Sequence, residues 1–184
     1  MQQSAEQHET SMMAVLRLEP EQVESVCRQH PEVYPVNYNC PGQISVAGAS
    51  SQMKAFAADI KAAGGRVLPL KVKGAFHSPF MEAAAEAFGR ELEKTELKTP
   101  EIPLYANLTG DIYPESVKET LSNQIKSPVQ WEKTIRNMIA DDVDTFIEIG
   151  PGQTLTNMIR KIAGEVKTYS LSEIERIFEE VQPC

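Results

Sequence analysis

The chain has 184 residues, 41% of them hydrophobic and 24% charged, which is ordinary for a globular protein. Its 26 acidic residues outnumber its 18 basic ones, and the formal net charge of −8 argues against a general nucleic-acid-binding protein, whose surface would be basic. The longest apolar run, Met12–Leu16, is far shorter than the roughly 20 residues that cross a bilayer. No secretory signal is visible, and three cysteines without a CxxC pair suit a reducing compartment. We therefore expect a cytoplasmic protein that binds neither nucleic acid nor membrane.

The first part of the chain has the pattern of a small domain with both helices and strands. Residues 1–10 are polar and are expected to form a flexible lead-in. Short apolar runs then alternate with segments whose apolar residues recur every three or four positions. Strands are predicted over 12–18, 33–39, 43–47 and 66–72, and helices from Glu19-Pro20 onward and over 50–63. The order β-α-β-β-α-β over residues 11–72 predicts a split, ferredoxin-like motif.

The remainder of the chain, residues 73–184, predicts an α/β arrangement with parallel strands. Helices are expected over 79–95, 115–126, 129–140 and 153–163, and strands over 102–107, 145–149 and 167–171. The first of these helices is expected to bury Met81, Ala84, Ala85, Phe88 and Leu92. Ser172 and Glu175 have the spacing of a capping box that starts a C-terminal helix. Because three strands are few for an open sheet, this part is expected to belong to a larger domain.

His77 is the histidine best placed for chemistry. It lies among small and apolar residues, immediately before the predicted N-cap Ser78, whereas His8 and His30 are expected at the surface. A histidine in such a loop can act as a general base if a partner orients its second ring nitrogen. The alternative is a packed loop histidine bonded to a backbone carbonyl. No nucleophile or metal site accompanies it, since the sequence has no G-x-S-x-G elbow and no histidine pair with metal-ligand spacing.

A local excess of positive charge lies between residues 54 and 73. This basic stripe contains five cations against the single acidic residue Asp59, namely Lys54, Lys61, Arg66, Lys71 and Lys73. Such a stripe can attract an acidic partner or a ligand that carries phosphate. It can equally be the solvated face of a helix and a strand.

Four motifs in order resemble the malonyl-CoA:acyl carrier protein transacylase family. Asn37–Gln43 is similar to its N-x-N-x-P-G-Q turn, and Gly74–Ser78 to the segment that carries its catalytic histidine. Ser127–Trp131 is similar to its N/S-P-V-Q-W element, and Glu148–Gly152 to its E-x-G-P-G turn. The resemblance begins near residue 11 and implies a ferredoxin-like small subdomain followed by the C-terminal part of an α/β-hydrolase-like acyltransferase domain.

The resemblance also implies an activity and the residues that carry it out. In the family, a serine is acylated by malonyl-CoA and then attacked by the phosphopantetheine thiol of acyl carrier protein, without a further cofactor. By this resemblance His77 is the general base and acid, and the backbone carbonyl of Gln124 fixes its tautomer. Asn39 lines the cleft, and Phe76 crowds out an α-methyl group on the substrate.

The family's N-terminal half has no counterpart in this sequence. That half contains the G-Q-G-x-Q strand end, the G-H-S-L-G-E elbow with the nucleophile, and the arginine that pairs with the malonyl carboxylate. We therefore expect the chain to be inactive alone, to act with an N-terminal half supplied in trans, and to self-associate through exposed apolar surface. The alternatives are a non-catalytic module that holds acidic carrier protein through the basic stripe, and a remnant without a role.

Overall fold

The computed structural model describes residues 1–98 and 100–174, which divide into a first unit, residues 1–134, and a second unit that starts at Ile135. The chain begins with a short helix, α1 (Gln2–Ala5), within the segment expected as a lead-in. In the described part of the chain, no helix has both the length and the apolar content that a membrane span requires.

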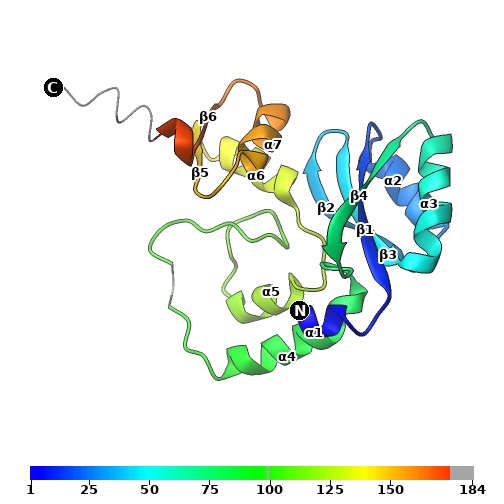
Figure 1. Ribbon diagram of the computed structural model, residues 1–184. Coiled ribbons are helices and arrows are strands. Elements are labelled where there is room, and N and C mark those ends of the chain that lie inside the picture. The colour runs from blue at the N-terminus through cyan, green and yellow to red at the C-terminus, as the bar shows by residue number, and fades with distance from the viewer. Residues whose placement is uncertain (99, 175–184) are drawn as a thin grey trace. The chain divides into compact units, whose positions relative to one another are not determined.

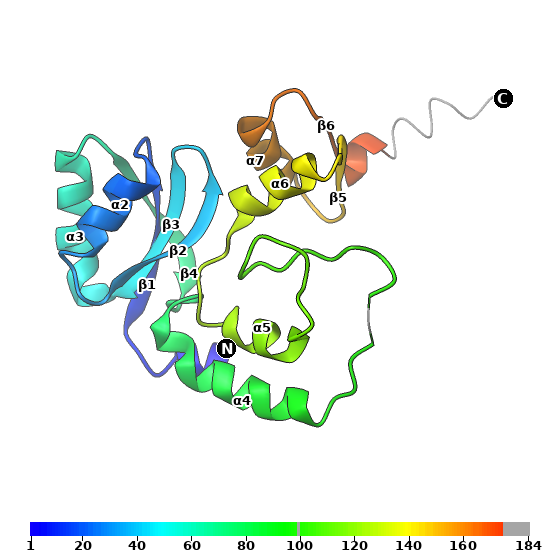
Figure 2. The same cartoon turned by 180° about the vertical axis from the view of Figure 1, so that it is seen from behind.

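The first unit contains the expected β-α-β-β-α-β motif. Its elements are β1 (Thr10–Leu16), α2 (Pro20–Cys27), β2 (Val33–Cys40), β3 (Gln43–Ala49), α3 (Ser50–Ala62) and β4 (Arg66–Lys73). The strands form an antiparallel sheet in the order β2-β3-β1-β4. Figures 1 and 2 show both helices on one face of this sheet. The order places the first and third strands in the centre, as a ferredoxin-like fold requires, and confirms the prediction.

Alternating side chains give the sheet two apolar faces. On the helix side, Val15 of β1 packs with fully buried residues of α3 such as Phe56 and Ile60. Each such side chain contributes about 1.5–3 kcal/mol by leaving water. On the opposite face, Met12 and Val36 pack against the loop that follows β4. This second apolar cluster fixes the loop that carries His77.

The loop after β4 leads into a helix of two parts. A 3-10 turn, η1 (Pro79–Met81), precedes α4 (Glu82–Glu93). Four of the five residues expected to be buried are buried, but Phe88 is 39% exposed. The next helix, α5 (Val117–Asn123), covers α4 near Ala85 and Gly89, so Phe88 lies at the margin of the packed face.

The predicted strand over 102–107 is wrong. Residues 94–98 and 100–116 lie outside the helices and strands (Figure 2), and the part from Leu104 to Tyr113 folds back on itself as an irregular hairpin with one isolated antiparallel bridge between Tyr105 and Ile112. Ile102 and Leu104 are 75% and 51% exposed. A strand requires pairing with a second strand over several residues, and among the described residues of the first unit this segment makes only the single bridge to Ile112.

The helix predicted from residue 129 begins later, as α6 (Trp131–Ala140). The reason is that Val129 pairs with β2: its N–H donates to the carbonyl of Val36, and its carbonyl accepts from the N–H of Tyr38, both at 2.9 Å. A residue whose backbone groups are used by a strand cannot begin a helix.

The second unit contains the C-terminal end of α6 and a parallel pair of strands, β5 (Thr145–Glu148) and β6 (Lys167–Ser170), joined through α7 (Thr154–Ile162). The parallel pairing was predicted. The Gly-Pro-Gly segment is a tight turn between β5 and α7, with Gly150 and Gly152 at positive φ. Glu148 accepts hydrogen bonds from the N–H groups of Leu155 and Thr156 and so caps α7. Leu171–Ile174 are helical, and Glu175 of the predicted capping box lies outside the described residues.

Candidate functional site

His77 has a backbone conformation that is rare for a residue with a side chain. Its φ is +60°, in the left-handed region, and its side chain is half-buried. The loop is held in place around His77, since Ala75 and Ser78 are buried and the hydroxyl of Ser78 donates to the carbonyl of Ala75. Residues held in sparsely populated conformations cluster at functional sites. The sequence gives no local signal for this left-handed conformation, because histidine is not a residue type that requires it.

The His77 ring contacts the end of α5. Its Nδ1 lies 2.9 Å from the backbone carbonyl oxygen of Gln124, the C-cap residue of that helix. The last carbonyls of a helix have no partner within the helix, so Gln124 offers a free acceptor. Since a carbonyl only accepts, Nδ1 carries the hydrogen and Nε2 keeps the lone pair of the neutral ring. The contact implied by the family resemblance is present, and the catalytic role of the pair stays a prediction.

Two side-chain interactions fix the helix that offers this carbonyl. The hydroxyl of Ser122 donates to the carbonyl of Ala85 at 2.8 Å, which ties α5 to α4. The ammonium group of Lys126 lies 2.6 Å from the carboxylate of Glu82, at the start of α4. Because only the short turn η1 separates the His77 loop from α4, these contacts hold the two partners of the hydrogen bond against one another.

The other two predicted residues, Phe76 and Asn39, both precede His77 in the sequence. Phe76 is half-buried in the second apolar cluster, beside His77 in the chain. Asn39 lies near the end of β2, and its amide donates to the hydroxyl of Ser45 on β3 at 3.1 Å. Because Val129 pairs with β2 between Val36 and Tyr38, the strand that carries Asn39 is joined to the segment that follows Gln124. Two of the four sequence motifs are thus neighbours in space.

Tyr113 was not foreseen from the sequence. Its hydroxyl donates to the side-chain oxygen of Gln124 at 3.1 Å. It lies outside the four motifs, so no sequence pattern pointed to it.

The other nucleophile and base candidates are less suited to chemistry. Burial, and secondarily the charge of Glu24, raises the pKa of the Cys27 thiol to about 12, which keeps it protonated. Burial and the hydrogen bond to Glu24 likewise raise the pKa of Tyr38. His30, expected at the surface, is largely covered and lies 2.8 Å from Asp59. Within residues 1–98 and 100–174 no cluster of three or more metal-ligating side chains is present.

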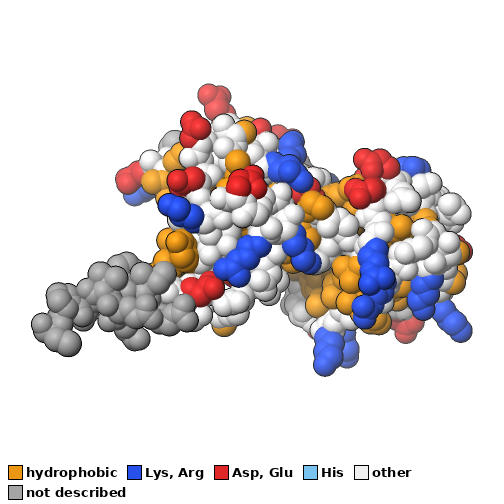
Figure 3. Space-filling model, turned by 90° about the horizontal axis from the view of Figure 1, so that it is seen from above, with side chains coloured by type: hydrophobic (Ala, Val, Ile, Leu, Met, Phe, Trp, Pro, Cys, Tyr) orange, Lys and Arg blue, Asp and Glu red, His pale blue; other side chains and the backbone are white. Residues whose placement is uncertain are grey.

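The basic stripe is exposed along its whole length. Arg66, Lys71 and Lys73 lie on β4, an edge strand of the sheet, and Lys54 and Lys61 lie on α3. Leu68 and Val72 are exposed on the same edge strand. Figure 3 shows Lys and Arg side chains with apolar ones beside them on the ferredoxin-like part, at the right of the view. The surface therefore combines charge with apolar area.

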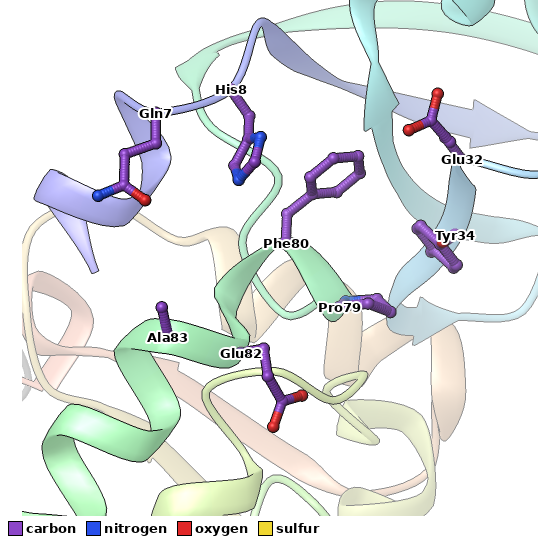
Figure 4. Close-up of a pocket in the computed structure, with 8 residues that line it drawn as sticks. All are labelled: Gln7, His8, Glu32, Tyr34, Pro79, Phe80, Glu82 and Ala83. Carbon is purple, nitrogen blue, oxygen red and sulfur yellow. The ribbon is translucent and has the colours of Figure 1, made fainter.

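Two of the hollows in the first unit bear on the site, although His77 lines neither. The smaller, about 350 Å³, lies where Phe80 makes T-shaped ring contacts with His8 and Tyr34 (Figure 4). Its two carboxylates are already engaged, Glu82 by a lysine and Glu32 by a glutamine amide. The larger, about 1140 Å³, is a mainly apolar groove lined by residues 95–98, 100–104 and 112–119, among them Tyr113.

Comparison with known proteins decides the family. The family described as the acyl transferase domain matches residues 2–175. The chain belongs to this acyl transferase family. A malonyl CoA-acyl carrier protein transacylase of Bacillus subtilis is 36% identical over 176 residues, which are 92% of this chain and 56% of the relative. The predicted resemblance is thereby confirmed.

Solved acyl transferase structures agree with the fold. The malonyl CoA-acyl carrier protein transacylase of Clostridium perfringens is 35% identical, with a TM-score of 0.88 over 94% of this chain and 57% of that one. A malonyl-transacylase solved in complex with a type II PKS acyl-carrier protein is 27% identical, with a TM-score of 0.90 over 97% of this chain and 62% of that one. The chain thus spans little more than half the length of these acyl transferases.

Proposed function

We propose that this chain supplies the histidine-bearing part of a malonyl-CoA:acyl carrier protein transacylase. The observation that carries the proposal is the hydrogen bond from Nδ1 of His77 to the carbonyl of Gln124, because it leaves Nε2 with the lone pair of a base. The names of the relatives supply the substrate class, a malonyl group moved from coenzyme A to a carrier protein.

In the first half of the proposed reaction, Nε2 of His77 takes the proton of a serine hydroxyl supplied by another segment. The serine oxygen attacks the thioester carbonyl of malonyl-CoA, the carbon–sulfur bond breaks, and the imidazolium returns the proton to the leaving thiolate. The products are a malonyl-serine ester and free coenzyme A.

The second half of the reaction reverses these roles. His77 takes the proton of the phosphopantetheine thiol on the carrier protein, and the thiolate attacks the serine ester. The serine oxygen leaves and regains the proton from His77. Phe76 is proposed to disfavour an α-methyl group beside the reacting carbonyl, and Asn39 to line the cleft.

The apolar groove supports the proposal that a further segment completes the enzyme. The sequence of 184 residues contains no G-x-S-x-G elbow, and the relatives are nearly twice as long. Ile102, Leu104 and Ile112 line the groove and are exposed, in a segment with a strand-like pattern and a single bridge. We assign the N-terminal half of the family domain as the occupant, since apolar area of this kind is normally covered.

The experiment is reconstitution from two pieces. Mixed with the N-terminal half of the Bacillus subtilis relative, the chain should transfer malonyl groups from malonyl-CoA to carrier protein, followed by intact mass. His77→Ala should slow transfer by about 10²–10⁴-fold, the usual size of acid–base catalysis. His30→Ala is the matched control, because His30 pairs with Asp59 and should leave the rate unchanged.

Two outcomes would contradict the proposed reaction. A stoichiometric malonyl adduct on the chain alone would show that its nucleophile lies in this sequence. Transfer by the mixture that survives His77→Ala would show that His77 has no part in the reaction.

Light scattering tests the docking surface. The chain alone should self-associate and the mixture should not, whereas a clean monomer of the chain at high concentration would contradict an exposed docking surface.

The basic stripe favours a second candidate, a module that holds carrier protein without catalysis. Its cations are exposed on α3 and β4 and would attract an acidic surface in a salt-dependent manner. Titration of carrier protein into the chain separates the two candidates. The binding module is favoured if carrier protein binds, if the double change Lys71→Glu, Lys73→Glu abolishes this binding, and if reconstitution gives no transfer.

A further inference from the structure

We infer that Tyr113 is a positioning residue that holds Gln124 so that its carbonyl faces His77. The inference rests on the proposed role of His77 and adds a member to that site. The hydroxyl of Tyr113 donates to Oε1 of Gln124 at 3.1 Å, and the carbonyl oxygen of Gln124 lies 2.9 Å from Nδ1 of His77. Gln124 thus links the two groups, accepting from Tyr113 through its side chain and from His77 through its backbone carbonyl.

Gln124 gains from an anchor of its own, in addition to the contacts of Ser122 and Lys126, because of where it lies. It is the C-cap of a helix of seven residues, and the ends of short helices fray readily. A carbonyl at a frayed end turns toward water and leaves the ring without its acceptor. A neighbour can bind the side-chain amide of Gln124 and leave the backbone carbonyl available to His77. The hydroxyl of Tyr113 binds the side chain in this way.

Tyr113 in turn is fixed by the backbone around it. Its N–H donates to the carbonyl of Leu104 at 2.9 Å, beside the bridge between Tyr105 and Ile112. A tight turn closes this pair of segments, with Gly110 at φ +71° and its N–H donating to Ala106 at 2.8 Å. Tyr113 therefore approaches Gln124 from a braced hairpin rather than from a free loop.

The hairpin is also tied to the segment that follows Gln124. The N–H of Gln130 donates to the carbonyl of Asn107, in the same turn, at 2.8 Å. The hairpin thus meets the chain on both sides of the Ser127-Pro128 bend, at Gln124 through Tyr113 and at Gln130 through Asn107. A role confined to packing would not need the hydroxyl, since a phenylalanine ring fills the same space.

The test reads the His77 ring directly in the 184-residue chain. Long-range ¹H–¹⁵N spectra resolve the ring nitrogens of the three histidines, and His77→Ala identifies the signals of His77. Spectra are taken at a pH above which the ring shifts no longer change, so that the neutral tautomers are compared. In the unaltered chain, Nδ1 of His77 should have the shift of a protonated nitrogen and Nε2 that of an unprotonated one.

Tyr113→Phe should lower the ratio of the Nδ1–H to the Nε2–H tautomer of His77 by about fivefold, the equivalent of one hydrogen bond of about 1 kcal/mol. Gln124→Ala keeps the backbone carbonyl but removes the anchored oxygen, so it should have the same effect. The double variant should change the ratio no further, because both changes break the same link. Gln124→Ala also serves as the readout if Tyr113→Phe does not fold.

Tyr38→Phe is the matched control. It too removes a hydrogen-bonded phenol from the first unit, the one that donates to Glu24 at 2.7 Å, and it should leave the His77 shifts unchanged. An unaltered tautomer ratio in Tyr113→Phe, additive effects in the double variant, or an equal effect of Tyr38→Phe would overturn the inference. These spectra need no activity: if reconstitution fails while the ratio still depends on Tyr113, the proposed function is wrong and the positioning stands.

Discussion

Replacing His77 by glycine and, separately, by alanine isolates the backbone strain at this position from the loss of its ring. Both variants lose the hydrogen bond to Gln124, worth about 0.5–1.5 kcal/mol. They differ in whether residue 77, whose φ is +60°, has a Cβ while its backbone is in the left-handed region. The comparison therefore tests the local conformation on which the placement of the ring depends.

The expected difference follows from two opposing terms. A residue with a Cβ pays about 1–2 kcal/mol in the left-handed region, and glycine avoids this cost. Glycine instead loses about 0.4–1 kcal/mol because its unfolded chain has more freedom. The glycine variant should thus be more stable than the alanine variant by about 0.5–1 kcal/mol. At an ordinary φ the order would be reversed.

Urea unfolding measures this difference in the free energy of unfolding. With a slope near 2 kcal/mol per molar, the midpoint of His77→Gly should lie about 0.4 M above that of His77→Ala. The same pair of changes at Arg90, an exposed position within α4, should give the opposite order, with alanine favoured by about 1 kcal/mol. If His77→Ala were at least as stable as His77→Gly, the left-handed conformation of His77 would be refuted.

Two further predictions concern the rest of the fold. Gly48→Ala should lower the free energy of unfolding by about 1–3 kcal/mol, since the added Cβ would lie 2.4 Å from a backbone carbonyl oxygen; an unchanged urea midpoint would mean that the backbone there is farther apart. Hydrogen bonds from N–H groups of α7 hold the pKa of Glu148 below its usual 4.5, so the carboxylate stabilises the fold above about pH 4.5 and loses this effect as the pH falls through the lowered value. Glu148→Gln should therefore lower the Tm at neutral pH but not in acid, and a difference in Tm that is constant with pH would contradict this.

The sequence predicted those parts of the fold that local pattern determines. The apolar alternation of the four strands and the three-to-four spacing in α2 and α3 were sufficient to predict the ferredoxin-like motif. The segment 102–107 has the same kind of pattern but lacks a neighbouring strand, and pairing is not a local property. Val129 was assigned to a helix because its partner in β2 lies about 90 residues earlier in the sequence.

The candidate site was predictable only in part. From the residues alone, loop packing explained His77 better than catalysis did, and the family resemblance supplied both the catalytic role and the partner Gln124. The left-handed backbone of His77 and the hydroxyl of Tyr113 depend on tertiary contacts. They could not be found in a single sequence, since neither histidine nor tyrosine signals such a role by its type or spacing.

The pairing of Val129 with β2 has a consequence for the order in which the molecule assembles. It closes a chain loop of about 90 residues, and the entropy lost on closure grows with loop length. Contacts between distant parts of a sequence form slowly compared with neighbouring hairpins and helices. We therefore expect the ferredoxin-like sheet to form first during folding. The hydrogen bond between His77 and the carbonyl of Gln124 would form afterwards, so the candidate site would be completed later than the sheet.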